Sequence, residues 1–508
     1  MILTNGHILT MAGREIPRGA LRIVDGKIAQ VIEGDLSKKE PSSDRVMDLK
    51  RKTVLPGFID SHAHVIFTGF SLSSVDLSHA TSRDDVLEAV RDRVSQTEQG
   101  EWVFGTQLVY RNMREKRNPT MNELDQVSDK NPVWLLSDTC HSSVANSTGF
   151  EKIGLPADFP GVEKDPLTEK PTGGFITDPA HFGASRRILG SLKKEAIQSM
   201  IQMVCQRAAT KGVTTLHAMD GSPDSDRNFL ILLETILQAP IKVVPYFQTM
   251  DVDRVLELGL PRIGGCLTLD GAWSEHTVAL KEPYHDLPES QGMLFYTDQQ
   301  VERFVQRAHE AGLQIGMHAI GDMAIEQLLN SYEKALEKVP RVDHRHRIEH
   351  FCLPMPHHIE RAKTLGLVVA MQPMFSYNWG GPEGTYVQYL GNERANRIED
   401  YRVLFDKGIK ICGGSDSPVT SIDPIMGIHA AVNNPFFDHR VSVEEALCMF
   451  TYNGAWSAHE ENLKGSIEVG KAADLVVLTE NPKALPYKNL SNLRVAMTLV
   501  DGKIVYEG

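Results

Sequence analysis

Amphipathic segments alternate with apolar runs through the middle of the chain. Four times such a segment ends at a glycine that an apolar run follows, at Gly212, Gly312, Gly366 and Gly408. Glycine just past a helix is a common left-handed stop. Before Gly312 the apolar positions repeat at helical spacing, at Val301, Phe304, Val305, Ala308 and Ala311. Helices that alternate with apolar strands predict a parallel sheet of the α/β class, most simply a (β/α)8 TIM barrel.

The pattern predicts eight barrel strands within residues 55–463. They lie near 55–61, 213–217, 242–247, 264–269, 313–318, 346–350, 367–372 and 409–415. The first connection is far too long for one helix, so we expect an insertion at about 66–200. Within it, the stretch 154–176 is rich in proline and glycine and predicts a loop.

The two ends of the chain resemble each other. Val-Asp-Gly-Lys-Ile occurs at 24–28 and again at 500–504, and Asp-Gly between apolar runs is typical of a turn joining two strands. We therefore predict one small β-sandwich domain composed of residues 1–54 and 464–508.

Composition narrows the possible partners. Of 508 residues, 41% are hydrophobic and 23% charged, which excludes wholesale disorder. The formal net charge of −13 argues against nucleic acid as a partner. No apolar run approaches the roughly 18 residues of a membrane span, and the six cysteines form no CxxC pair. We expect a cytoplasmic protein with a small-molecule substrate and no nucleic-acid or membrane partner; a possible homodimer is suggested by analogy alone.

Five polar residues end predicted barrel strands, where barrel enzymes build their active sites. His62 and His64 lie on one side of an extended chain, because strand side chains alternate. Alone, this pair could belong to an ordinary turn. Together with His318, His350 and Asp416 it predicts a divalent metal site.

Several motifs resemble the amidohydrolase superfamily, specifically amidohydrolase family 3. They are Pro56–His64, His318–Asp322, Arg347–His350 and Gly414–Val419. The resemblance implies a metal-bearing barrel with one or two divalent ions, most simply zinc. It implies that His62, His64 and Asp416 hold a first ion, that His318 and His350 hold a second where there is one, and that Asp416 shuttles a proton.

One position departs from the family pattern. Many relatives carry a metal-bridging lysine on the fourth strand, where this chain has Cys266. A thiolate is a good zinc ligand, so Cys266 is a candidate ligand. The alternative is a small buried hydrophobe, in which case a single ion would suffice.

Three further residues are candidates for substrate binding. His217 ends the second strand, His141 lies in the insertion, and Gln372 ends the seventh strand. For the two histidines the alternative is an ordinary residue at the rim. The Gly-rich segment after Gln372 predicts a loop, either a lid or a solvated connection, that carries Tyr377, Trp379 and Tyr386.

We therefore predict a metal-dependent amidohydrolase that cleaves the C–N bond of a small N-acyl or N-substituted compound. A deaminase is the first alternative, but the Glu expected three residues after His318 is absent. An ester or lactone hydrolase would need the same residues. A non-catalytic regulatory barrel is disfavoured because all five strand-end residues are present together.

Overall fold

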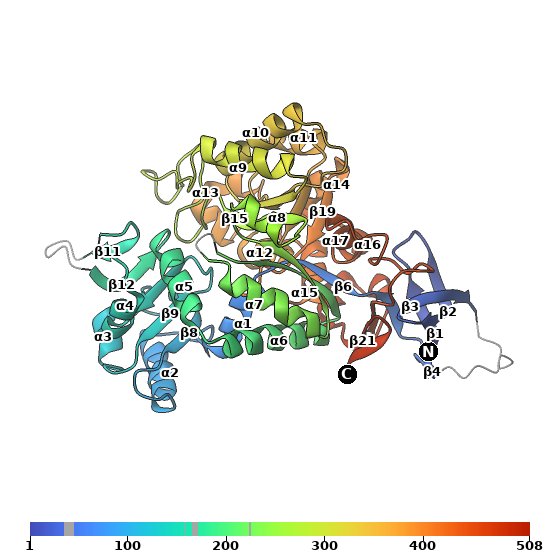
Figure 1. Cartoon of the computed structure of the whole chain (residues 1–508), viewed down its shortest axis with the longest axis horizontal. Helices are drawn as coiled ribbons and strands as arrows, with labels where there is room; N and C mark the ends of the chain where they lie inside the picture. Colours follow the sequence, from blue (N-terminus) through green and yellow to red (C-terminus); the bar gives the residue numbers. More distant parts are fainter. Residues whose placement is uncertain (35–44, 157, 165–170, 223–224) are drawn as a thin grey trace.

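The computed structural model describes residues 1–34, 45–156, 158–164, 171–222 and 225–508 (Figure 1). Its centre is a sheet of eight parallel strands that pair in chain order. The strands are β6 (Phe58–Ala63), β13 (Val213–Asp220), β14 (Lys242–Phe247), β15 (Arg262–Thr268), β16 (Gln314–Ala319), β17 (Arg347–His350), β18 (Val368–Met371) and β19 (Lys410–Gly413). Each overlaps a predicted strand, so the prediction of an α/β fold with a parallel barrel sheet is confirmed.

The first and last strands meet beyond the end of β19. Ala63 and Ser417 form a parallel bridge. The Asp416 N–H donates to the His62 carbonyl at 2.8 Å, and the His64 N–H donates to the Ser417 carbonyl at 2.9 Å. The sheet is thereby nearly closed, and the residues that follow β6 and β19 are brought together.

Helices cover the outside of this sheet. They include α6 (Lys194–Thr210), α7 (Arg227–Thr235), α8 (Val252–Glu257), α9 (Asp298–Glu310), α10 (Asp322–Lys338), α11 (Pro356–Thr364), α14 (Tyr401–Asp406), α15 (Pro424–Val432), α16 (Val443–Met449) and α17 (Tyr452–Ser457). The four predicted glycine stops are confirmed, with left-handed φ values of 79°, 80°, 67° and 75° in chain order.

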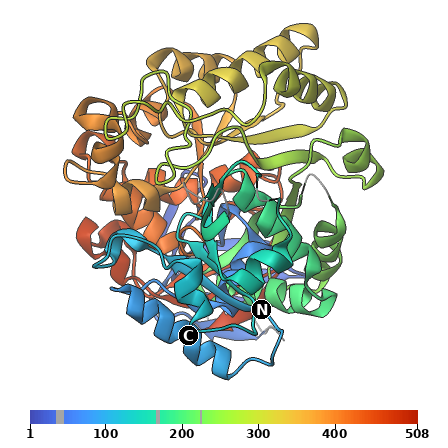
Figure 2. The same ribbon diagram turned by 90° about the vertical axis from the view of Figure 1, so that its left-hand side faces the viewer.

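A second sheet lies between β6 and β13 in the sequence (Figures 1 and 2). Its strands are β7 (Val75–Asp76), β8 (Val103–Leu108), β9 (Val133–Ser137), β10 (Ser142–Ala145), β11 (Val162–Lys164) and β12 (Pro171–Thr177). Its helices are α1 (Val65–Ser73), α2 (Arg83–Ser95), α3 (Met121–Asp125), α4 (Ser147–Ile153) and α5 (Ala180–Ser191). The loop predicted for 154–176 is wrong where β11 and β12 form; residues 157 and 165–170 of it lie outside the described residues.

Both ends of the chain contribute to a third sheet. From the N-terminal side come β1 (Ile2–Leu9), β2 (Glu15–Val24), β3 (Lys27–Glu33), β4 (Val46–Asp48) and β5 (Thr53–Pro56). From the C-terminal side come β20 (Leu475–Leu478), β21 (Val495–Val500) and β22 (Lys503–Glu507). The two sets join because β5 pairs antiparallel with β20. A sandwich of two layers, and the domain boundaries themselves, stay predictions; residues 35–44 lie outside the described part.

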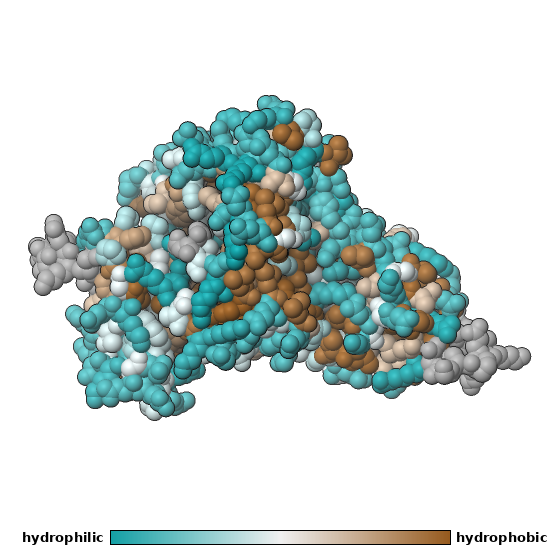
Figure 3. Space-filling view, in the orientation of Figure 1, coloured by the Kyte–Doolittle hydropathy of each residue, from teal (hydrophilic) through white to brown (hydrophobic). Residues whose placement is uncertain are grey.

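The segment after β18 is helical, contrary to the predicted loop. Trp379 and Tyr377 belong to α12 (Pro373–Trp379), and Tyr386 to α13 (Thr385–Ala395). The face in Figure 3 is mostly hydrophilic, with hydrophobic residues gathered toward its middle. Among the described residues, no helix is long and apolar enough to cross a membrane.

Candidate active site

Three polar atoms converge where β6 and β19 end. Asp416 Oδ1 lies 3.2 Å from His62 Nε2 and 3.1 Å from His64 Nε2. Neither His62 Nε2 nor Asp416 Oδ1 has a hydrogen-bond partner among the described residues, although both atoms are buried. Buried polar atoms without partners are costly, so their convergence fits a cation.

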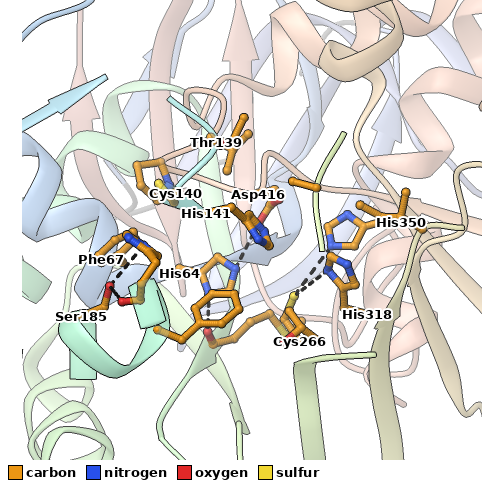
Figure 4. A pocket seen from close by; sticks show the side chains of 18 of the residues that line it. His64, Phe67, Thr139, Cys140, His141, Ser185, Cys266, His318, His350 and Asp416 are labelled. Atoms are coloured by element: carbon orange, nitrogen blue, oxygen red, sulfur yellow. Dashed lines mark hydrogen bonds and ion pairs between the residues drawn. The ribbon is translucent and has the colours of Figure 1, made fainter. Parts of the chain in front are cut away.

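A second group lies beside the first and shares His62 with it. Cys266, near the end of β15, places its Sγ 3.7 Å from His350 Nε2 and 3.8 Å from His318 Nδ1 (Figure 4). Potential ligand atoms of His62, Cys266 and His350 lie within 4.8 Å of one another, as do those of His62, His64 and Asp416. His318 belongs to neither triplet, although it lies beside Cys266.

Hydrogen bonds orient three of the imidazole rings. His62 Nδ1 donates to Glu349 Oε2 at 2.7 Å, and His64 Nδ1 donates to the Met219 carbonyl at 2.6 Å. His350 Nδ1 donates to Gln372 Oε1 at 2.8 Å. With Nδ1 carrying the proton, each ring turns the Nε2 lone pair toward the cluster, as a metal ligand must.

The cluster holds two anionic groups. Burial alone raises the pKa of the Cys266 thiol, but the His62, His318 and His350 imidazoles outweigh it and hold that pKa well below its ordinary range. The Asp416 pKa is likewise raised by burial, yet the histidines around it bring it well below its usual value. A thiolate, a carboxylate and imidazoles are the ligands that zinc prefers, so these residues fit a divalent metal.

The pKa values of two histidines in the cluster shift in the opposite direction. Burial lowers the pKa of His64, but Asp416 and Cys266 outweigh it and raise that pKa to about 10. The pKa of His318 also rises to about 10, against burial, because of Asp270 and Cys266. The anionic atoms therefore attract positive charge, which a metal ion would supply in place of protons.

Two of these residues adopt an uncommon backbone conformation. His350 has φ 73° and Asp416 has φ 53°, both in the left-handed region. Non-glycine residues in this region carry a conformational cost and cluster at functional sites. His350 is the last residue of β17 and Asp416 lies three residues beyond β19, and both side chains reach the cluster.

A third group of possible ligands does not fit a metal. Glu326, His357 and His358 lie close together near the surface. The Met355 N–H donates to His358 Nδ1, so His358 Nε2 must keep its proton and cannot ligate. Glu326 is already paired with Arg361 at 2.6 Å.

A cavity of about 460 Å³ opens over the cluster. It lies between the barrel and the inserted segment, since both His318 and His141 line it (Figure 4). Its wall is rich in aromatic side chains, namely Phe67, Phe159, Phe182, Trp273, Phe295, Tyr296, Phe375, Trp379, Tyr386 and Tyr389. Such a wall suits an apolar substituent on a small molecule.

Of the three predicted substrate-binding residues, only His141 lines the cavity. Its Nδ1 donates to Asp178 Oδ2 at 2.5 Å, and its ring centre lies 6.3 Å from that of His318. His217 is fully buried and accepts from Arg347 Nη1 at 3.0 Å. Gln372 is fully buried against His350. Substrate contact by His217 or Gln372 stays a prediction that this geometry does not favour.

Sequence reasoning missed the residues that orient the histidines. Glu349 lies within the Arg347–His350 motif, but no spacing rule says that its side chain reaches across the barrel to His62. The sequence likewise does not pair Asp270, a lesser match to the family pattern, with His318, although its Oδ1 lies 3.3 Å from His318 Nε2. The signal available was a carboxylate next to a strand-end ligand or on a neighbouring strand.

Comparisons with known proteins place the chain in a family. Residues 45–506 match the model of the amidohydrolase family (Amidohydro_3). The chain belongs to this family of metal-dependent hydrolases, as the resemblance in its sequence implied.

Individual relatives match over nearly the whole length. The chain is 28% identical to YtcJ of Bacillus subtilis over 99% of this chain and 98% of that protein. It is 27% identical to an N-substituted formamide deformylase of Arthrobacter pascens, over 100% and 98%. A crystal structure of an uncharacterized metal-dependent hydrolase from Pyrococcus furiosus superposes with a TM-score of 0.76 at 28% identity, covering 95% of this chain and 99% of that one.

Proposed function

We propose that this protein hydrolyses the C–N amide bond of a small N-acyl or N-substituted compound, with zinc as its metal. The observation that carries the proposal is the cluster of His62, His64, Cys266, His350 and Asp416 at the base of an aromatic-walled cavity. Bound there, zinc would polarise the amide carbonyl and make a water molecule acidic near neutral pH. His318 lies beside Cys266 and is a further candidate ligand.

Asp416 is the proposed proton shuttle. One of its oxygens lies with the two histidines of β6, and the residue also lines the cavity. Its pKa, held low by those histidines, keeps the carboxylate ionised and able to accept a proton from the attacking water. The same group can then deliver that proton to the departing nitrogen.

His141 is the proposed donor to the substrate oxygen. Burial lowers its pKa, but the Asp178 carboxylate outweighs burial and raises it, which favours a second proton on the ring, at Nε2. An imidazolium at the cavity wall can donate a hydrogen bond to the oxygen on which negative charge develops.

The cavity also bears on the substrate class. Its aromatic wall favours an apolar substituent, and its volume suits a molecule of modest size. The Arthrobacter relative, named for N-substituted formamides, supports an amide with a substituted nitrogen. N-substituted formamides with an aryl or alkyl group are therefore the first compounds to assay.

The test combines metal analysis with a panel of amides and esters. Wild-type protein should contain zinc, lose amide hydrolysis on chelation and regain it with zinc. Asp416→Asn should lower kcat by roughly 100-fold or more, whereas Cys412→Ala, at a buried cysteine outside the cavity, should not. Release of ammonia from an amino-heterocycle would favour a deaminase, and turnover of esters alone an esterase. Protein that binds no metal and turns over nothing would favour a regulatory role.

A further inference from the structure

A buried carboxylate that the proposed mechanism does not use lies against the ligand shared by both triplets. Glu349 Oε2 accepts from His62 Nδ1 at 2.7 Å, and neither side chain is exposed at all. Glu349 precedes His350 on β17, so one strand supplies a candidate ligand and also reaches a ligand on β6.

Arg347, two residues earlier, holds this carboxylate. Its guanidinium donates to Oε1 at 2.7 Å and to Oε2 at 2.8 Å, a two-pronged pairing. Arg347 Nη2 also donates to the Ser61 carbonyl at 2.8 Å, next to His62 in the chain. The pair therefore fixes β6 both through the His62 ring and through the backbone beside it.

The group that accepts a hydrogen bond from His62 Nδ1 is a carboxylate, whereas the acceptors for His64 and His350 are neutral. His64 donates to a backbone carbonyl and His350 to an amide oxygen, which are neutral acceptors. Glu349 lies in a two-pronged ion pair with the always-charged Arg347 guanidinium, so its carboxylate is the anionic member of that pair. An anionic acceptor makes an imidazole a stronger electron donor at its other nitrogen.

We propose that Glu349 is a positioning residue that directs His62 Nε2 into both triplets and strengthens it as a metal ligand, and that Arg347 holds Glu349 in place. The inference rests on the proposed metal site but not on the reaction catalysed there. It assigns to the Arg-x-Glu-His segment of β17 a role in metal affinity beyond the ligand His350.

Glu349→Gln is the decisive variant, because glutamine keeps the size and an acceptor oxygen but removes the charge. We expect zinc affinity, measured by competition with a chromophoric chelator, to fall between about 10- and 100-fold. The melting temperature of the metal-free protein should change little by comparison. Cobalt-loaded Glu349→Gln should show an altered visible spectrum, which reports the ligand field directly.

Glu399→Gln is the matched control. Glu399 is also a buried glutamate, but its hydrogen-bond partners among the described residues are Cys352 at 3.3 Å, Ser376 and Tyr401, none of which belongs to the cluster. Its substitution should leave zinc affinity and the cobalt spectrum unchanged.

The outcomes separate this inference from the proposed function. Wild-type affinity and spectrum in Glu349→Gln would overturn the positioning role alone, whereas wild-type protein without zinc affinity would contradict the metal site itself. Should Glu349→Gln fail to fold, Glu349→Asp keeps the charge beside Arg347 but withdraws it from His62. It should fold and bind zinc more weakly, and wild-type affinity there would equally overturn the role.

Discussion

At the scale of single residues, the surrounding histidines determine whether the Cys266 side chain is a neutral thiol or an anionic thiolate. Five of the six cysteines have a pKa raised by burial, whereas Cys266 alone has a lowered pKa because imidazoles surround it. A thiol with this surrounding acts as an anion, not as a small apolar side chain. The geometry thus favours the ligand interpretation of Cys266 over the core interpretation.

Cys266→Ala should reduce the metal content per chain, because it removes the thiolate from the triplet with His62 and His350. Elemental analysis after dialysis against limiting zinc measures the change. Cys205→Ala, at a fully buried cysteine of α6, is the control and should retain the metal. Equal metal content in all three proteins would make Cys266 a packing residue.

The sequence predicts the candidate ligands but not their partners, for a physical reason. Candidate ligands such as His62 and Asp416 end strands, and strand periodicity and motif spacing locate strand ends. The partner of His62 is set by the rotamer of Glu349 and by Arg347, which depend on packing across the barrel. No local pattern encodes that direction.

At the scale of elements, the glycine stops show how local backbone chemistry fixes the barrel. Gly312 and Gly212 both adopt left-handed φ values near 80°. A Cβ at Gly312 would meet no atom within 4 Å, whereas one at Gly212 would lie 2.6 Å from Val476 and 3.0 Å from Phe58. The first glycine is needed for its conformation, and the second also for close packing against β20.

Gly312→Ala should therefore lower the free energy of unfolding by about 1 kcal/mol, the cost of a left-handed alanine. Gly212→Ala should cost clearly more, because the clash with Val476 and Phe58 adds to the same backbone cost. Denaturant titration of the two variants measures both. An equal loss in both would show that the terminal sheet yields to the added methyl group without cost.

The elements that could be predicted were those with a strong local signal. All eight barrel strands are short apolar runs after glycine stops or turns, and the structure has a strand at each. The loop prediction for residues 373–395 was wrong because Gly380, Gly381 and Gly384 suggest a loop, whereas they only separate α12 from α13. The loop prediction was wrong at β11 and β12 because these strands form by pairing, β11 with β12 and β12 with β10, and carry no periodic pattern of their own.

At the scale of the whole molecule, the cavity depends on contacts between the insertion and the barrel. Thr139 and Ser142 of the insertion both donate to Glu275 Oε1, at 3.0 Å each, and Glu275 lies between β15 and α9. These bonds place His141 over the cluster. The sequence predicts an insertion, but which of its residues face the candidate metal ligands follows only from this long-range docking.

Histidines lie at both ends of β17, in the candidate metal cluster at one end and in a cluster of neutral rings at the other. At its C-terminal end, His350 belongs to the candidate metal cluster. Just before its N-terminal end, His346 accepts from the Ile315 N–H, and its Nε2 donates to His309 Nδ1 at 2.8 Å. His344 accepts from the His346 N–H and donates to the Leu365 carbonyl at 2.8 Å. These bonds require neutral rings, so protonation must break them.

This neutral cluster makes stability depend on pH. In an unfolded chain the pKa of histidine is about 6.5. Burial lowers the pKa of His344 to about 4 and that of His346 well below its ordinary value. Between those two pKa values the unfolded chain binds protons that the folded protein does not bind. The free energy of unfolding therefore falls as the pH drops from about 6.5 to about 4. For His344 alone the loss is roughly 3 kcal/mol.

His344→Gln should flatten this dependence, because glutamine can still accept and donate at the same position but does not titrate. We expect the melting temperature of the variant, measured on metal-free protein from pH 7 to pH 4, to fall less steeply than that of the wild type. Exposed His79→Gln is the control and should follow the wild-type curve. A wild-type slope in His344→Gln would mean that other groups cause the acid sensitivity, such as His181 and His358, whose pKa values burial lowers to about 3 and about 4. Carboxylates with lowered pKa values, such as Glu123 at about 2, act only below about pH 4.5.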